Sequence, residues 1–232
     1  MNDIWKDRCR RIWKEWAKPF LIILIVGCSL RSAVADWNYV PTGSMKPTIL
    51  EGDRIFVNRL AYDLKVPFTT WHLMEWADPR RGDIVVLYSP ADGKRLVKRL
   101  IGLPGDVLEL RDNQLFINTR PAMYESLDQK IQDQIPRDEQ MRYEFSSEKI
   151  GEHSHPVMTT PSRFSPRYYG PETVPPCHYF VMGDNRDNSF DSRGFGFVDR
   201  GLILGRATAT AISVDPSKYY LPRWNRFFRS LP

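Results

Sequence analysis

Hydrophobic and polar residues alternate in short runs along most of this 232-residue chain, and one apolar stretch stands apart. Residues 20–30 form this stretch, which is shorter than the roughly 20 residues that a membrane-spanning helix needs. Extending it to Trp16–Ala35 gives twenty positions, with Lys18 and Arg31 near the ends, where long basic side chains can reach the membrane interface. This pattern predicts one N-terminal transmembrane helix over residues 16–35.

The apolar stretch also allows a second interpretation, a signal peptide that is removed by cleavage. Residues 32–35, Ser-Ala-Val-Ala, resemble a small-residue cleavage site. The basic segment before the stretch, residues 1–18, is unusually long and Trp-rich for a signal peptide, which favours an uncleaved anchor. This segment holds six Lys or Arg residues against three acidic ones, so the positive-inside rule places it in the cytoplasm and the chain after Asp36 outside.

Beyond the anchor, the pattern changes to apolar runs of strand length that are bounded by Gly, Pro, Asn and Asp. A near-continuous apolar run such as residues 83–88 is typical of a buried strand. Residues 107–111 and 114–118 alternate on either side of Asp112-Asn113, which predicts a two-residue hairpin. The expected fold class is mainly β, with an antiparallel sheet. Further strand-like runs lie within residues 52–58, 94–101, 178–182 and 201–214.

The character of the chain divides the body into parts. Residues 36–118 and 178–218 hold the strand patterns and would form one β domain. Residues 119–177 are charged, rich in Pro, Gln and Ser and poor in β-branched runs, so we interpret them as an inserted smaller subdomain. Aromatic and basic residues are interleaved in the tail, 219–232, which suits a lipid headgroup interface as well as a solvated surface helix.

Composition narrows the classes of partner and cofactor. The net charge of +5 is modest and is concentrated partly next to the apolar stretch, which favours a membrane surface over nucleic acid. The three cysteines fall on the cytoplasmic side, within the span and in the external body, so no intrachain disulfide is expected. His153 and His155 are separated by a single residue and lack further ligands, which indicates a surface loop rather than a metal site.

Three segments concentrate the side chains that could perform chemistry. In the first, Ser44 lies between a glycine and a methionine, with Pro41 and Pro47 three residues to either side. Gly43 permits backbone angles closed to other residues and the prolines fix φ, so the Ser44 hydroxyl is presented from a stiff, non-helical turn. Taken alone, the segment is best interpreted as an ordinary turn, because short motifs match by chance.

The second segment is a predicted strand that contains Lys98. Alternation places Lys98 on the same face as Leu96 and Leu100, with Arg99 on the other face. An ammonium group on an apolar face has its pKa lowered by desolvation. A neutral lysine amine can take the proton of a serine hydroxyl, so Lys98 and Ser44 could form a dyad without histidine. A solvent-exposed lysine on an edge strand is the other interpretation.

Asp and Asn residues crowd the third segment, residues 183–193. Counted from Asp184, the sixth residue is a serine and the twelfth a phenylalanine, so the glycine and glutamate of an EF-hand calcium loop are missing. A structural loop held by Asx turns and by a pair between Asp191 and Arg193 would also explain the composition.

The order of these segments resembles that of the bacterial type I signal (leader) peptidases. The resemblance covers most of residues 37–118 and 178–214 and implies a serine endopeptidase with a Ser–Lys dyad. Segment 119–177 has no match and would be the β subdomain of longer members. The matching boxes are residues 41–48 for the nucleophile, 81–86 for the next strand, 97–106 for the lysine, 183–193 for the last box, and 205–207.

The resemblance implies a role for each matched residue. Ser44 would be the nucleophile and Lys98 the general base, while the Ser44 backbone N–H and the Thr42 hydroxyl would form the oxyanion hole. Thr42 stands where many members have serine, and the hydroxyl is retained. Ser189 would orient the lysine amine. The supporting residues would be Gly183, which gives the last box room, and the Asp191–Arg193 ion pair.

The same matching implies shallow apolar pockets that admit small residues, especially alanine, at the first and third positions before the cut. Phe190 departs from the small residue usual at its place, which concerns the packing of the loop rather than its chemistry. The residues implied for the pockets are Val40, Met45, Ile55, Val86, Leu96 and Val97.

The function we expect is removal of N-terminal signal peptides from exported preproteins after Ala-X-Ala-type sites, through an acyl-enzyme. No metal or organic cofactor is required, and the partners would be preproteins, the lipid bilayer and, in addition, the export translocon. The expected location is the bacterial inner (plasma) membrane, with one span, a cytoplasmic N-terminus and a periplasmic or extracytoplasmic catalytic domain. Two alternatives are a maturation protease for conjugation or pilus precursors and an inactive membrane-tethered scaffold, although the intact Ser44, Lys98 and Ser189 argue against the scaffold.

Overall fold

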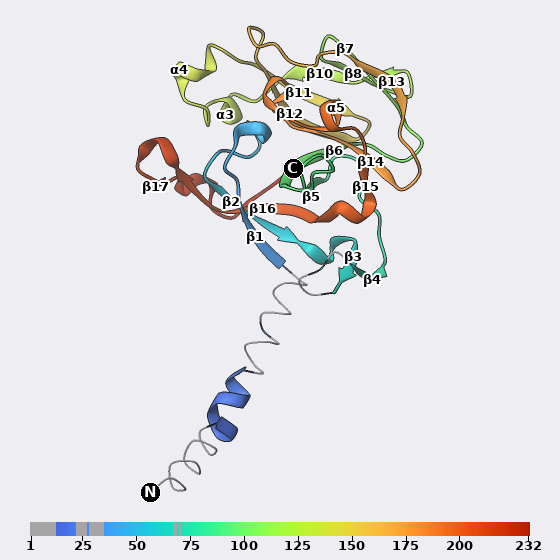
Figure 1. The fold of residues 1–232 in the computed structure, drawn as a ribbon. Helices are drawn as coiled ribbons and strands as arrows, with labels where there is room; N and C mark the ends of the chain where they lie inside the picture. Colours follow the sequence, from blue (N-terminus) through green and yellow to red (C-terminus); the bar gives the residue numbers. More distant parts are fainter. Residues whose placement is uncertain (1–12, 22–26, 28–34, 67–68, 70) are drawn as a thin grey trace, which may run out of the picture.

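The computed structural model describes residues 13–21, 27, 35–66, 69 and 71–232. A single π-helical turn, η1 (Trp13–Ala17), leads into helical residues 18–21, and the body follows (Figure 1). No helix among the described residues is both long and apolar enough to cross a membrane. Most of the predicted anchor, residues 16–35, and most of the predicted cytoplasmic segment, residues 1–18, lie outside the described part of the chain.

One antiparallel sheet of nine strands forms the centre of the body (Figure 1). Its order is β1-β2-β16-β5-β6-β14-β15, and β17 and β18 also pair with the long β16. The predicted mainly β, antiparallel fold is thereby confirmed. The strands are β1 (Ala35–Tyr39), β2 (Asp53–Asn58), β5 (Ile84–Tyr88), β6 (Arg95–Gly102), β14 (His178–Met182), β15 (Val198–Asp199), β16 (Ile203–Asp215), β17 (Leu221–Pro222) and β18 (Arg229–Ser230).

Three smaller antiparallel sheets surround this one. They are the hairpin of β3 (Asp63–Lys65) and β4 (His72–Glu75), the sheet β13-β7-β8-β9 and the sheet β10-β11-β12. The strands of the latter two are β7 (Val107–Arg111), β8 (Gln114–Ile117), β9 (Arg120–Pro121), β10 (Met123–Ser126), β11 (Glu144–Ile150), β12 (His153–Thr159) and β13 (Tyr169–Thr173). The short helices are η2 (Gly43–Met45), η3 (Arg59–Ala61), α3 (Gln129–Gln132), α4 (Arg137–Gln140), η4 (Arg186–Asn188), α5 (Ser192–Phe195), η5 (Arg200–Leu202), η6 (Pro216–Lys218) and η7 (Trp224–Arg226).

The hairpin predicted around Asp112-Asn113 is confirmed. Both residues have positive φ, 48° and 64°, which is the conformation that a two-residue type I′ turn requires. Arg111 pairs with Gln114 directly across the turn, so β7 and β8 are joined with no extra residue. The local sequence therefore sets both the turn and the register of this hairpin.

Segment 119–177 is built of short helices and strands that pack beside the main sheet (Figure 1). Its sheet β10-β11-β12 touches the last box through a bridge between Met158 and Asn185. His155, which we predicted to lie in a surface loop, is only 2% exposed in β12, so that prediction is wrong. The physical reason is that β12 packs against the loop after β14, which covers one face of the strand.

The core lies on both faces of β5 and β6. Ile84 to Leu87 are at most 1% exposed, as expected for a continuous apolar run in a central strand. Three apolar clusters fill the space around the central strands, and one of them lies beneath the turn that carries Ser44. This cluster contains Val40, Met45, Ile49, Ile55, Val57, Ile84, Val86, Leu204 and Ala207.

Candidate active site

Buried side chains and hydrogen bonds hold the turn that carries Ser44. Ser44 is the middle residue of the single 3-10 turn η2, and the side chains of Met45 and Ile49 beyond it are fully buried. The Ile49 N–H donates to the Met45 carbonyl at 2.9 Å, and the Leu50 N–H donates to the Asp53 carboxylate at 2.9 Å. Burial and these bonds fix the backbone, so the half-buried Ser44 is held in one place.

Lys98 meets Ser44 from the neighbouring strand β6. Its Nζ lies 2.8 Å from Ser44 Oγ, which is within reach for proton transfer, and the residue is 2% exposed. Burial lowers the pKa of Lys98 from 10.5 to about 8, against the opposing effect of the Asp191 and Asp184 carboxylates. The Arg193 guanidinium adds to the lowering. The amine is therefore neutral in a substantial fraction of molecules near pH 8.

The last box supports the site through a buried ion pair. Arg193 donates to both oxygens of Asp191, at 2.8 Å from Nε and 2.9 Å from Nη2, and both side chains are at most 1% exposed. Burial alone would raise the pKa of Asp191, but Arg193 brings it below its ordinary value. Asp191 Oδ2 also accepts the Gly183 N–H at 3.0 Å. The pair thus closes the loop between residues 183 and 193.

Gly183 is required by a close approach. A Cβ atom at this position would overlap the Ser189 side chain and the Ser44 carbonyl oxygen. The structure thus brings Ser189 close to the backbone of Ser44. The Ser189 Oγ is buried, and among the described residues no hydrogen bond joins it to the Lys98 amine, so this predicted bond stays a prediction.

Two residues that we did not assign from the sequence support the segment that carries the nucleophile, one through Ser44 itself and one through Thr48. The Asn185 N–H donates to the Ser44 carbonyl at 3.1 Å, and its side-chain amide donates to the Gly43 carbonyl at 3.1 Å. Asp184 forms two 2.9 Å hydrogen bonds with Arg99 and accepts the Thr48 hydroxyl. The density of Asp and Asn in this loop was the available signal, but it also fits a purely structural turn.

The predicted pocket residues do not all gather at one place. Four of them, Val40, Met45, Ile55 and Val86, share the cluster beneath the Ser44 turn and are at most 3% exposed. Val97 packs at the edge of that cluster, whereas Leu96 packs against a different one.

Thr42 and Phe190 both present their side chains to solvent. Thr42 precedes η2 in an extended conformation, with φ −128° and ψ 152°, and its side chain makes no hydrogen bond to the turn. Phe190 is 56% exposed and packs edge-on against the ring of Phe195, with the two ring centroids 5.3 Å apart. The Thr42 hydroxyl is therefore available to an approaching substrate.

The chemistry that this arrangement permits is nucleophilic attack by a hydroxyl with an amine as base. A buried amine with a pKa of about 8 beside a serine hydroxyl can accept its proton and later return it. Among the residues described, no group of three or more His, Cys, Asp and Glu side chains is placed to hold a metal ion.

Comparisons with known proteins agree on one family. A family model described as signal peptidase, peptidase S26, matches residues 13–212. The signal peptidase I of Pseudomonas fluorescens is 36% identical over 225 residues, which cover 91% of this chain and 77% of the relative. The signal peptidase I of Pseudomonas aeruginosa is 33% identical with the same coverage. The signal peptidase I P of Bacillus subtilis subsp. natto is 35% identical over 82% of this chain and 84% of the relative.

Proposed function

Because the chain belongs to the signal peptidase family, peptidase S26, we propose that Ser44 and Lys98 are the dyad with which it cuts its substrates. The chain is a serine endopeptidase of the signal peptidase I type, and it cleaves signal peptides from preproteins. The observation that carries the assignment of the dyad is the 2.8 Å contact between a fully buried amine and a serine hydroxyl. The alternatives of a pilus-precursor protease and an inactive scaffold are not favoured.

Acylation follows from the geometry of the dyad. The neutral Lys98 amine takes the proton of the Ser44 hydroxyl as Oγ attacks the scissile carbonyl carbon, which forms a tetrahedral intermediate. The resulting ammonium returns this proton to the nitrogen of the leaving peptide, and the C–N bond breaks. The signal peptide is then held as an ester on Ser44. In deacylation the same amine takes a proton from water, which attacks the ester carbonyl. The bond from this carbon to Ser44 Oγ breaks, the signal peptide leaves with a free carboxylate, and the Lys98 ammonium returns the proton to Ser44 Oγ.

The oxyanion would be stabilised by the backbone N–H of Ser44 and the hydroxyl of Thr42. The first N–H groups of a short helix have no acceptor within it, so the N–H of Ser44 at the start of η2 is suited to this task. The hydroxyl of Thr42 is exposed and not engaged with the turn. Each such donor typically contributes about 3 kcal/mol of transition-state stabilisation.

The substrate preference that we propose is small residues at the first and third positions before the cut. The side chains of Met45, Ile55 and Val86 have no exposed surface, so they would lie beneath the substrate site and support a shallow floor rather than line a deep pocket. Leu96 and Val97 remain partly exposed and would contact the extended signal peptide. A shallow apolar floor accommodates alanine and excludes larger side chains.

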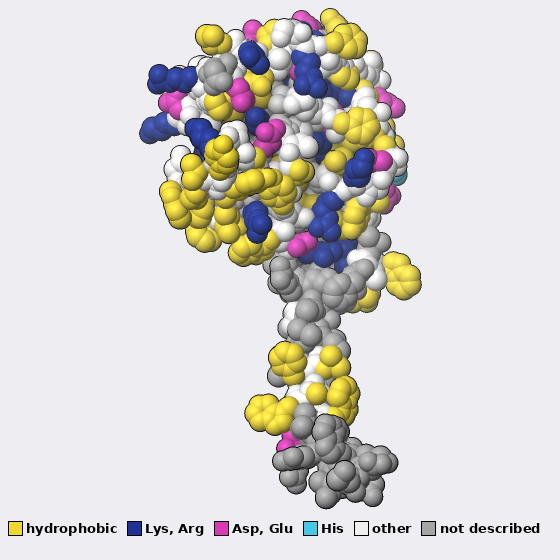
Figure 2. Space-filling model, turned by 60° about the vertical axis from the view of Figure 1, so that its left-hand side comes forward, with side chains coloured by type: hydrophobic (Ala, Val, Ile, Leu, Met, Phe, Trp, Pro, Cys, Tyr) yellow, Lys and Arg dark blue, Asp and Glu magenta, His cyan; other side chains and the backbone are white. Residues whose placement is uncertain are grey.

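We place the enzyme at the extracytoplasmic face of the inner membrane, anchored by residues 16–35, with 36–118 and 178–218 as its catalytic domain. Figure 2 shows hydrophobic side chains gathered on the lower part of the body in that view. Among the most exposed large apolar residues are Tyr219, Trp224 and Phe228 of the C-terminal tail, which suits contact with lipid headgroups. A preprotein in the same bilayer, delivered by the export translocon, would meet the site at a raised effective concentration.

The dyad is tested with purified protein and a radiolabelled preprotein. Ser44→Ala and Lys98→Ala should each lose cleavage, while Lys94→Ala serves as the matched control because Lys94 lies exposed just before β6. Cleavage by Lys98→Ala at the wild-type rate would remove Lys98 from the mechanism. The cut site is read by mass spectrometry, and cleavage after large residues would contradict the proposed shallow floor.

A further inference from the structure

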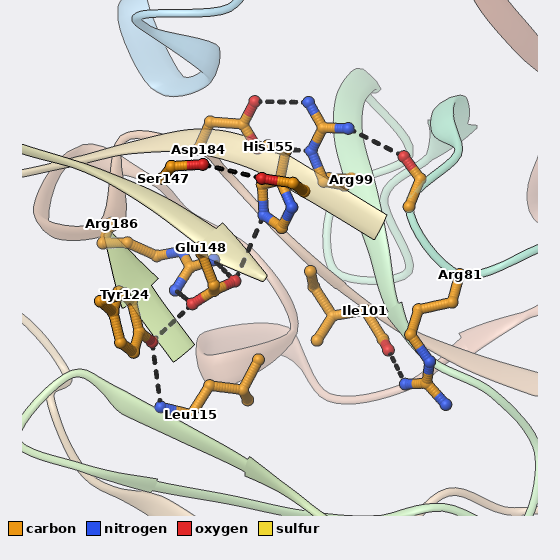
Figure 3. A network of polar contacts seen from close by, with 12 residues as sticks. Arg81, Arg99, Ile101, Leu115, Tyr124, Ser147, Glu148, His155, Asp184 and Arg186 are labelled. Atoms are coloured by element: carbon orange, nitrogen blue, oxygen red, sulfur yellow. Dashed lines mark hydrogen bonds and ion pairs between the residues drawn. The ribbon is translucent and has the colours of Figure 1, made fainter. Parts of the chain in front are cut away.

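A carboxylate with no exposed surface lies on the inserted segment, close to the last box. Glu148 in β11 accepts hydrogen bonds from Arg186 at 2.7 and 2.5 Å and from the Tyr124 hydroxyl at 2.5 Å (Figure 3). His155 Nε2 lies 3.2 Å from Glu148 Oε2. The side chains that meet here come from β10, β11, β12 and η4, so the cluster joins segment 119–177 to the last box.

Arg186 links Glu148 to the loop of residues 183–188, which contacts the backbone of Ser44. Its side chain is 1% exposed, and its Nε donates to the Gly183 carbonyl at 3.3 Å. Its own carbonyl oxygen accepts Arg193 Nη2 at 2.6 Å. Asn185, the preceding residue, donates to the carbonyls of Gly43 and Ser44, as described above. Arg186 thus lies at the centre of the loop that supports the nucleophile.

The charges around Glu148 balance in pairs. Glu148 faces Arg186, and Asp184 faces Arg99, while His155 lies among these groups (Figure 3). Burial alone would raise the pKa of Glu148, but Arg186 and His155 bring it well below its ordinary value, so it stays ionised. Burial and the positive charge of Arg99 lower the pKa of His155, which keeps the ring neutral at working pH. Removal of either member of a buried pair leaves the other charge uncompensated.

We infer that Glu148 is a positioning residue for signal-peptide cleavage, which fixes Arg186 and thereby holds residues 183–188 against the backbone of Gly43 and Ser44. Glu148 touches neither member of the dyad and acts only through the loop. Without the Glu148 carboxylate, the Arg186 side chain would turn toward water, and its contacts with the Gly183 carbonyl and with Arg193 would be lost. The inference rests on the proposed roles of Ser44 and Lys98, and it gives segment 119–177 a part in catalysis.

Glu148→Gln tests this inference, because the amide keeps the shape of the side chain and removes its charge. The matched control is Glu144→Gln, since Glu144 lies exposed on the same strand. We expect kcat of the full-length enzyme to fall at least about tenfold in the first variant, with KM for a preprotein within about twofold of the wild type. Both parameters should be unchanged in the control. Rates are measured well below the thermal midpoint of each protein, so that all are folded.

A double variant, Glu148→Met with Arg186→Met, separates positioning from stability. Replacing both charges by apolar side chains of similar volume should restore much of the thermal midpoint that Glu148→Gln loses, while kcat stays low because the loop contacts of Arg186 are gone. The inference is overturned if kcat of Glu148→Gln stays within about threefold of the wild type, if the loss lies only in KM, or if the double variant recovers kcat with its midpoint. Ser44→Ala distinguishes the two levels, because cleavage by that variant would refute the dyad whatever Glu148 does.

Discussion

The pH dependence of cleavage tests the proposed base directly, because only the neutral form of Lys98 can accept the Ser44 proton. Burial lowers the pKa of Lys98 to about 8. Below this pH the amine is protonated and inactive as a base, and above it the amine is neutral. We therefore expect kcat/KM to fall about tenfold for each pH unit below 8 and to level off above it.

The size of the effect follows from the fraction of neutral amine. With a pKa of about 8, about one-tenth of the molecules hold a neutral Lys98 at pH 7 and about one-hundredth at pH 6. At the ordinary lysine pKa of 10.5, the fraction at pH 7 would be roughly 300-fold smaller. Burial of this one side chain thus decides whether the enzyme works near neutral pH.

The assay is kcat/KM for one preprotein from about pH 6 to about pH 10 at constant ionic strength. Asp191→Asn is the informative variant, because the Asp191 carboxylate raises the pKa of Lys98 and the Arg193 freed by the change lowers it. The acid limb of this variant should therefore move to lower pH. A wild-type profile that is flat between pH 6 and 8 would refute the reasoning, as would a limb in the variant that moves to higher pH.

Three further outcomes are expected. Thr42→Val should lower kcat by about 100-fold, because it removes an oxyanion donor, whereas Thr42→Ser should retain the wild-type kcat. Both are measured by preprotein cleavage at saturating substrate. Equal rates for the two variants would remove Thr42 from the oxyanion hole. Gly183→Ala should lower both the thermal midpoint and kcat, because the added methyl group overlaps Ser189 and the Ser44 carbonyl. Calorimetry measures the midpoint and preprotein cleavage measures kcat. Wild-type values for both would contradict the prediction. Cleavage should be insensitive to chelators, because the dyad supplies the base itself; a loss restored by zinc would count against that mechanism.

The local features of the fold could be predicted from the sequence where one residue type dictates the backbone. Asp112-Asn113 is such a place, because few residues other than Asn, Asp and Gly adopt two successive positive φ angles. The apolar run at residues 84–87 is another, since a run of this length between turn residues is typical of a strand buried on both faces. The pairing of Lys98 with Ser44, by contrast, depends on a contact across 54 residues, and the resemblance to a family supplied it rather than the pattern.

What the sequence did not reveal are the buried polar groups of the inserted segment. Glu148 and His155 lie in a charged stretch without apolar periodicity, so their residue types favoured an exposed position. Burial of Glu148 becomes possible because Arg186 comes from a distant part of the chain and compensates its charge. Such tertiary pairing leaves no periodic signal in the sequence. The pocket residues show the same limit, because alternation places Leu96 on a strand but does not say which cluster receives it.

The pairing of charges around the dyad has a consequence for Lys98 itself. A lone carboxylate in the same dry region would stabilise the ammonium form and raise the pKa of Lys98, and a lone guanidinium would do the opposite. Asp191 and Asp184 do raise it, but Arg193 acts against them and burial outweighs both carboxylates. Because each carboxylate is paired with its own arginine, the loop can lie close to the Lys98 amine without stabilising its protonated form. Within each ion pair the carboxylate and the guanidinium largely cancel each other's effect on Lys98, so desolvation sets the pKa of its amine.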